Sequence, residues 1–213
     1  MNSVEPVRHF TDPDALIVSE PAGSPRRAVF LDRDGVINLD LGYVHTAEQT
    51  RWVPGIFDFC RAARAAGFLL VIVTNQAGIA RGLYEEECFL EYTRWMHEQF
   101  NAQGTPLAAT YYCPHHPTAG VGAGLRDCAC RKPKPGMLLA AAVALQLDLS
   151  LCILVGDTKS DLRAAADAGV GRYFQLKVEA SGPPPTGNGQ TFGSLPTLSE
   201  ALGWQTFVNP GVP

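Results

Sequence analysis

The chain has 213 residues, which is enough for one domain with a substantial core and too few for two large ones. Hydrophobic residues make up 46% and charged residues 18%, as in globular proteins, and the net charge of −4 argues against a surface for nucleic acid or anionic membranes. The longest wholly apolar run, residues 137–145, is far shorter than the roughly 20 residues of a membrane span, and no secretory signal is seen, so we expect a cytoplasmic protein.

The chain begins with a stretch of little periodicity. Residues 1–26 mix Pro, Asp, Ser and Arg, and we expect an extended arm that can pack on the rest of the protein through Leu16–Val18. Regular patterns run from 27 to 205 without internal repeats, which predicts a single domain, and residues 206–213 are predicted to be a disordered tail.

The first strand is predicted at residues 28–31, four consecutive apolar residues that are typical of a buried strand in a parallel sheet. It ends abruptly at Asp32 and Asp34, and Gly35 then allows a sharp turn. Carboxylates at the carboxyl end of such a strand lie where α/β sheets bind their ligands. Taken alone, however, Asp-x-Asp-Gly is equally consistent with a plain polar turn.

Strands and helices alternate along the rest of the chain. Apolar runs predict strands at 68–73, 108–112, 151–155 and 171–176. Apolar residues at helical spacing predict helices at 54–67, 85–101, 135–147 and 160–168, and a short one at 199–202 after a Pro- and Gly-rich loop at 181–190. This alternation predicts an α/β fold, a Rossmann-like parallel sheet with helices on both faces.

Some polar or reactive side chains on these helices are assigned to the core or the surface. Cys60 falls on the apolar stripe of its helix and is predicted to be core. Cys88 and Trp95 flank the stripe of the next helix and are also expected in the core. His97, on the same helix, is expected at the surface rather than as a metal ligand.

Three of the predicted strands end in polar chemistry, and in a parallel sheet those ends lie along one edge. The side chains are Asp32, Asp34, Thr74, Asn75 and Asp157. With Asp161 they bring four carboxylates together, which would repel one another without a cation. An all-oxygen site with open positions suits Mg²⁺. Two alternatives stay open: Asp157 as a helix N-cap, and Asp161 as a cap partner or a residue behind the metal ligands.

A hydroxyl from Thr74 and a positive charge from Lys132 complete what a phosphoryl group requires. Lys132 alone could also be part of a solvated basic turn, because Arg131 and Lys134 are its neighbours. Together the groups indicate phosphoryl transfer through an aspartyl-phosphate. Asp32 would be the nucleophile, and Asp34 would protonate the leaving oxygen and then activate water.

Four metal-ligand side chains flank a Gly-rich segment at 113–130. Three thiolates and one imidazole predict a closed, structural Zn²⁺ site that supplies folding energy to this loop. The ligands are Cys113, His115, Cys128 and Cys130. His116 is expected to pack or face solvent. The other cysteines are isolated, which favours a reducing compartment.

The ordered motifs Asp32-x-Asp34-Gly, Thr74-Asn75, Lys132 and Gly156-Asp157-x-x-x-Asp161 resemble those of the haloacid-dehalogenase-like phosphohydrolases, over about residues 27–177. The stretches Leu-Asp-Arg-Asp-Gly-Val-Ile-Asn, Gly-Tyr-Val-His and Cys-Arg-Lys-Pro-Lys-Pro-Gly-Met look like the heptose bisphosphate and histidinol-phosphate phosphatases of that family, with the heptose group favoured. The resemblance implies a Mg²⁺-dependent enzyme that dephosphorylates a small sugar phosphate.

The resemblance also implies roles for individual residues. Mg²⁺ would be held by Asp32, Asp157 and the backbone carbonyl of Asp34. The residues implied to meet the substrate are Asp40, Leu41, Gly42, Tyr43, Asn75, Gln76, Ala77 and Arg131. One departure is Thr158, where the family often has lysine.

The gaps between motifs are too short for a large cap domain, so selectivity is expected from residues 38–45, Arg81 and the zinc loop. We expect a monomer that binds neither nucleic acid nor membranes. The competing hypothesis from another class is a zinc-loop binding module without catalysis, against which the intact acidic set and the negative net charge count.

Overall fold

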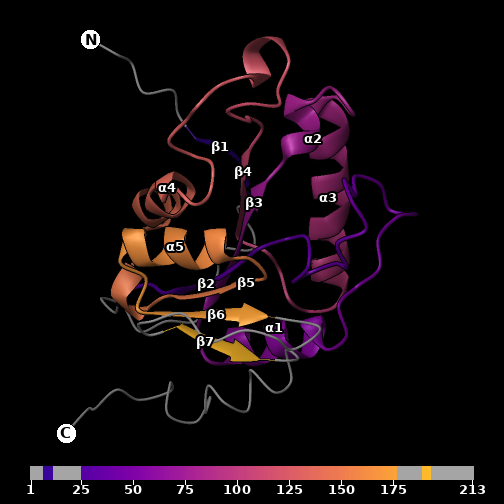
Figure 1. Ribbon diagram of the computed structural model, residues 1–213. Coiled ribbons are helices and arrows are strands. Elements are labelled where there is room, and N and C mark those ends of the chain that lie inside the picture. Colours follow the sequence, from indigo (N-terminus) through magenta and orange to yellow (C-terminus); the bar gives the residue numbers. More distant parts are fainter. Residues whose placement is uncertain (1–6, 12–24, 177–188, 193–213) are drawn as a thin grey trace, which may run out of the picture.

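The computed structural model describes residues 7–11, 25–176 and 189–192. Its centre is a seven-stranded sheet in the order β1-β4-β3-β2-β5-β6-β7 (Figure 1). The strands are β1 (Arg8–Thr11), β2 (Ala28–Leu31), β3 (Leu69–Asn75), β4 (Ala109–Cys113), β5 (Ile153–Gly156), β6 (Arg172–Leu176) and β7 (Gly189–Phe192). Neighbours from β4 to β7 pair in parallel, whereas β1 pairs with β4 antiparallel.

Helices cover both faces of the sheet, as predicted (Figure 1). They are α1 (Ile56–Ala65), α2 (Ala77–Ala80), α3 (Glu86–Ala102), α4 (Gly136–Leu145) and α5 (Lys159–Ala168), with the short 3₁₀ turns η2 (Gly122–Gly124) and η3 (Leu149–Leu151). No helix in this described part of the chain is both long and apolar enough to span a membrane.

Strand β2 lies in the middle of the sheet and is buried on both faces. Val29 and Leu31 point into the core shared with α1 and α3, whereas Ala28 and Phe30 point into the core shared with α4 and α5. This alternation follows from the two-residue period of a strand. It explains why β2 is wholly apolar, and it fixes the position from which Asp32 leaves the sheet.

Two segments outside the expected strands join the sheet. Part of the N-terminal arm forms β1, which makes the sheet mixed rather than wholly parallel. Residues 189–192 form β7 where the Pro- and Gly-rich sequence had predicted a loop to residue 190, so that boundary is wrong. Both segments lack the long apolar run that predicts a buried strand. They become strands because they pair with the outer strands β4 and β6 of the sheet. The expected contact through Leu16–Val18, the helix at 199–202 and the tail at 206–213 lie outside the described residues.

The predictions for the helix side chains have mixed outcomes. Cys60 is buried as predicted, and Trp95 is partly buried against the same core. Cys88 is exposed, so its assignment to the core is wrong; it precedes Phe89, which takes the buried position. His97 is buried, not at the surface, because β4 and β1 lie over it: its Nε2 is 2.9 Å from Thr110 Oγ1, and its ring packs edge-on against Phe10.

Candidate active site

The carboxyl ends of β2, β3 and β5 meet at one edge of the sheet, around a cavity of about 480 Å³. Each strand therefore delivers the polar residues at or directly after its carboxyl end, as the sequence predicts. The cavity is lined by Asp32, Arg33, Asp34, Asp40, Gly42, Tyr43, Thr74, Asn75, Gln76, Ala77, Gly78, Tyr84, Arg131, Lys132, Asp157, Thr158 and Ser160. Of the predicted substrate-facing residues, only Leu41 is missing from this lining, and its side chain is 59% exposed.

The chain turns sharply after β2 because residue 35 is glycine. Gly35 has φ +84°, a left-handed conformation that other residues adopt at a cost. A Cβ atom at this position would lie 2.4 Å from Asp157 Oδ2. Glycine is therefore required at this position for two reasons: the left-handed φ, and the close approach of the turn after β2 to the carboxylate of Asp157, which follows β5.

Lys132 is buried among carboxylates. Its Nζ lies 2.9 Å from Asp32 Oδ1 and 2.5 Å from Asp161 Oδ1, and it donates a hydrogen bond of 2.8 Å to the carbonyl of Val73. Burial opposes the charge on Lys132, but Asp161 and Asp32 outweigh it and raise its pKa, so the side chain is cationic. The alternative of a solvated basic turn is therefore wrong for Lys132, although it describes Lys134, which is exposed.

Asn75 fixes the backbone that carries this lysine. Its Oδ1 accepts a 3.0 Å hydrogen bond from the Lys132 N–H, and its Nδ2 donates a 3.1 Å bond to the Lys132 carbonyl. The side-chain amide of Asn75 is thus used within the protein, while the residue still lines the cavity. It joins the end of β3 to the turn at Lys132.

Thr74 is oriented by a short chain of hydrogen bonds. Gln76 Nε2 donates to Thr74 Oγ1 at 2.8 Å, and the Tyr84 hydroxyl donates to Gln76 Oε1 at 2.7 Å. Because the Thr74 oxygen accepts a bond from Gln76, its own proton is available to donate into the cavity. The buried amide of Gln76 serves Thr74 and Tyr84, a role that the sequence did not indicate.

Asp161 acts behind the cavity and at the start of α5. Its Oδ2 accepts bonds from the Thr158 N–H (3.0 Å) and hydroxyl (2.5 Å), which completes a capping box, while its Oδ1 pairs with Lys132. Burial alone would raise the pKa of Asp161, but Lys132 and Thr158 lower it. The N-cap of α5 is Thr158. The alternative that Asp157 caps this helix is therefore wrong, and Asp157 is left to face the cavity.

The carboxylates of Asp32, Asp157 and Asp161 lie close enough for one oxygen of each to be within 4.8 Å of the others. Burial raises the pKa of Asp157 to about 6; the charge of Asp161 adds to this rise, and Lys132 opposes it. Burial also raises the pKa of Asp32, against the effect of Lys132. Ionising both Asp32 and Asp157 is therefore costly in the protein alone. A hard divalent cation bound to their oxygens would offset this repulsion, so the pair suits an oxygen-ligand metal site.

Asp34 is held by donors from its own turn. Arg33 makes a two-pronged contact with it, with Nη2 at 2.7 Å from Oδ2 and Nε at 3.2 Å from Oδ1, and Asn38 Nδ2 donates to Oδ1 at 2.9 Å. The sequence reasoning missed Arg33. The available signal was a cation placed between two acids directly after a buried strand.

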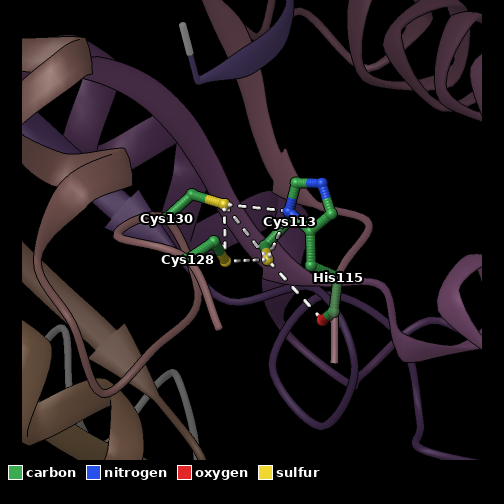
Figure 2. Close-up of side chains that lie close together, drawn as sticks. All are labelled: Cys113, His115, Cys128 and Cys130. Carbon is green, nitrogen blue, oxygen red and sulfur yellow. Dashed lines mark hydrogen bonds between the residues drawn. The ribbon is translucent and has the colours of Figure 1, made fainter. Parts of the chain in front are cut away.

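The four predicted zinc ligands converge at the end of β4 (Figure 2). Cys130 Sγ lies 3.1 Å from Cys128 Sγ, 3.2 Å from Cys113 Sγ and 3.5 Å from His115 Nδ1. The cysteines are free thiols, and three sulfurs with one imidazole nitrogen form the donor set of a structural metal site. His116 takes no part in this group; its Nδ1 accepts backbone bonds from within the loop.

The loop between these ligands docks on α2, the helix that contributes Ala77 and Gly78 to the cavity wall. The Val121 N–H donates a 2.8 Å hydrogen bond to the carbonyl of Ala80 in α2, and Gly124 packs so closely that a Cβ would lie 2.8 Å from the Ala80 Cα. Arg131, directly after the last cysteine, donates a 3.0 Å bond to the His115 carbonyl. The metal-ligand loop and the cavity wall are therefore one connected structure.

A largely parallel sheet whose strand ends bring Asp-x-Asp, Thr and Asp to one cavity, together with a buried Lys, defines a haloacid-dehalogenase-like phosphatase. A family model described as HAD-hydrolase-like matches residues 129–174. The chain is 45% identical over 168 residues to the D-glycero-beta-D-manno-heptose-1,7-bisphosphate 7-phosphatase of Vibrio cholerae, covering 79% of this chain and 89% of the relative. It is 49% identical over 145 residues to the alpha-anomer enzyme of Burkholderia mallei, covering 68% and 77%.

The solved structures agree with this assignment. The D,D-heptose 1,7-bisphosphate phosphatase of B. bronchiseptica, complexed with magnesium and phosphate, superposes with a TM-score of 0.72 at 31% identity, covering 85% of this chain and 99% of that one. A HAD-like phosphatase of Mesorhizobium loti gives a TM-score of 0.81 at 28% identity, covering 99% and 98%. The chain belongs to the heptose 1,7-bisphosphate 7-phosphatase family of the HAD-like phosphatases.

Proposed function

We propose that this enzyme removes the 7-phosphate of D-glycero-D-manno-heptose 1,7-bisphosphate through an aspartyl-phosphate. The names of its relatives support the substrate. The observation that carries the chemistry is the Asp32 carboxylate at the cavity, paired with the buried Lys132 at 2.9 Å. A buried cation beside a carboxylate prepares a site for a phosphoryl group, which brings further negative charge.

The residues at the cavity divide the reaction into two steps. Asp32 attacks phosphorus, the bond to the sugar oxygen breaks, and Asp34 gives that oxygen its proton. Asp34 then takes a proton from water, whose oxygen attacks the phosphorus and releases inorganic phosphate and free Asp32. Thr74 donates its hydroxyl proton to a phosphoryl oxygen, and Lys132 stabilises the negative charge.

Two metals fit the two donor sets. Asp32, Asp157 and the backbone carbonyl of Asp34 would hold Mg²⁺, which supplies positive charge against the phosphoryl oxygens. The thiol and imidazole cluster would hold Zn²⁺ in a structural role, because its four protein ligands fill a tetrahedral site. This use of thiols for a metal rather than for disulfides supports a cytoplasmic location.

Substrate selectivity is assigned to the loops around the cavity. Asp40, Gly42, Tyr43 and Arg131 all line the cavity, and the guanidinium of Arg131 is also anchored to the metal-ligand loop. Since the proposed substrate carries a second phosphate, we assign its recognition to Arg131, a cation that lines the cavity. The alternative substrate, histidinol phosphate, has a single phosphate and a cationic group instead.

Phosphate release from purified enzyme with Mg²⁺ tests this proposal. The panel contains both heptose bisphosphate anomers, histidinol phosphate and simple sugar phosphates, with Asp32→Asn as the matched inactive variant. We expect kcat/KM for one heptose anomer to exceed that for histidinol phosphate by about 100-fold or more, since the polar groups that meet the second phosphate would stay unpaired. A preference for histidinol phosphate would refute the substrate, and absence of turnover on every ester would favour the binding-module hypothesis.

A further inference from the structure

Arg33 is a buried cation whose side chain reaches Asp34 and the substrate-facing loop at once. The side chain is only 2% exposed. Its Nη2 contacts Asp34 Oδ2 at 2.7 Å and Oδ1 at 3.0 Å, and donates a 2.6 Å bond to the carbonyl of Val44. Val44 directly follows Tyr43, which lines the cavity. One guanidinium therefore connects the residue assigned to proton transfer with the loop assigned to substrate contact.

The surroundings of Arg33 fit orientation better than simple stabilisation. Its guanidinium carbon lies 5.3 Å from the ring centre of Tyr92 and 5.7 Å from that of Phe89. Within the described residues its Nη1 has no hydrogen-bond partner. Burying an ion pair gives little net stability, since desolvation offsets the attraction. A planar guanidinium that makes two hydrogen bonds to a carboxylate and packs between aromatic rings does, however, fix the orientation of that carboxylate.

We propose that Arg33 is a positioning residue for leaving-group protonation. It holds the Asp34 carboxyl at the cavity in a fixed position relative to the loop of residues 39–45. The inference rests on the proposed function, in which Asp34 transfers the proton. Asn38 supports the same carboxylate through Nδ2 and shares in the role. Removal of Arg33 then weakens the step in which the departing oxygen needs a proton, and leaves attack on phosphorus largely intact.

The choice of leaving group tests this role. A sugar alkoxide is strongly basic and must be protonated as it leaves, whereas nitrophenolate leaves without a proton. The value of kcat/KM reports the steps up to departure of the leaving group. It is measured for heptose bisphosphate and for 4-nitrophenyl phosphate with wild type, Arg33→Lys, Arg33→Met and Asn38→Ala.

For Arg33→Met we expect kcat/KM on the sugar phosphate to fall about 100-fold or more, the scale of general acid catalysis, and on the nitrophenyl ester to fall less than about 5-fold. Arg33→Lys keeps the charge but loses the fork, and is expected to show the same selective loss. Equal losses on both substrates would overturn the proposal. If Arg33→Met does not fold, Arg33→Lys and Asn38→Ala decide by the same ratio.

Arg27 provides the matched control. Its guanidinium also lies over an aromatic ring, that of Phe68 at 4.4 Å, and Nη2 also donates to a carbonyl, that of Ala66 at 2.7 Å, but it does not line the cavity. Arg27→Met should leave the ratio of the two kcat/KM values unchanged. If wild type dephosphorylates another sugar phosphate but not the heptose, the proposed substrate fails, and the same comparison on that sugar phosphate still tests Arg33.

Discussion

Asp161 pairs with Lys132 from behind the cavity, with Oδ1 2.5 Å from Nζ, while the same ammonium group meets Asp32 on the cavity side. The pairing joins the start of α5 to the end of β2 through one buried cation. Asp161 thereby opposes free movement of Lys132, and its second oxygen caps α5. In the proposed mechanism, stability and catalysis therefore depend on the same three side chains.

Replacing Lys132 should therefore damage both properties. Lys132→Met keeps much of the side-chain volume but leaves two buried carboxylates without their cation, which we expect to cost about 3–5 kcal/mol of unfolding free energy. Activity should fall about 1,000-fold or more, because the phosphoryl group loses a buried positive charge. Urea unfolding and phosphate release measure the two effects. Lys134→Met, at an exposed pair with Asp127, is the control, and an equal loss of stability there would contradict the account.

Gly35→Ala should abolish activity through a steric clash. Its Cβ would meet Asp157 Oδ2 at 2.4 Å, in addition to the strain of φ +84°. Gly104→Ala is the matched control, since that residue has φ +71° and nothing within 4 Å of the added atom. We expect both variants to lose about 1 kcal/mol or more from the left-handed backbone, but only Gly35→Ala to lose Mg²⁺-dependent turnover. Comparable activity in the two variants would show that the close approach to Asp157 is unimportant.

The raised pKa of Asp157, about 6, predicts how pH acts on the metal-free protein. The folded state binds this proton more tightly than the unfolded state, in which the pKa is near its ordinary value. The contribution of Asp157 to stability is therefore largest below the unfolded pKa, falls as pH rises through about 6, and then levels off.

Mg²⁺ requires the ionised carboxylate, so its stabilising effect should have the opposite pH dependence. The rise in Tm on adding Mg²⁺ should be small at pH 5 and reach a plateau above about pH 6–7, with apparent affinity falling about tenfold per pH unit on the acid side. Thermal unfolding with and without Mg²⁺ from pH 5 to 8 measures this. Asp157→Asn should remove most of the Mg²⁺ effect, and a pH-independent effect in wild type would exclude this ionisation as its cause.

Removal of metal from the cysteine cluster should lower activity through the neighbouring basic residues. Cys130 immediately precedes Arg131 and Lys132, so releasing Cys130 loosens the backbone that Asn75 holds. With a strong zinc chelator in excess Mg²⁺, we expect kcat/KM to fall about 10–100-fold and to recover on adding Zn²⁺, with Cys128→Ser matching the chelated enzyme. Full activity in protein shown by metal analysis to lack zinc would refute this coupling.

Much of the site could be predicted from the sequence because buried strands and helical stripes have distinct periods. The apolar run at 28–31 located β2, and the polar residues after it located Asp32 and Asp34 at the ligand-binding edge. Three cysteines and a histidine, together with the family resemblance, likewise predicted a cluster that Figure 2 shows assembled. The strand and its acidic end are local features, so a few neighbouring residues suffice to specify them.

Only the tertiary structure decided which partner each polar group takes. The prediction for His97 was wrong because its burial depends on Phe10 of β1, which lies far away in the sequence, and on Thr110 of β4. The prediction for Cys88 was wrong because the neighbouring Phe89 takes the buried position on α3. Likewise the sequence by itself determined that acids would gather at the strand ends, but not that Thr158 caps α5 while Asp161 holds Lys132. Hydrogen bonds and ion pairs act over about 3 Å and across any sequence separation, so periodicity does not encode them. Arg33 stands between two acids in the sequence, and only the tertiary structure shows that its side chain contacts both Asp34 and the Val44 carbonyl.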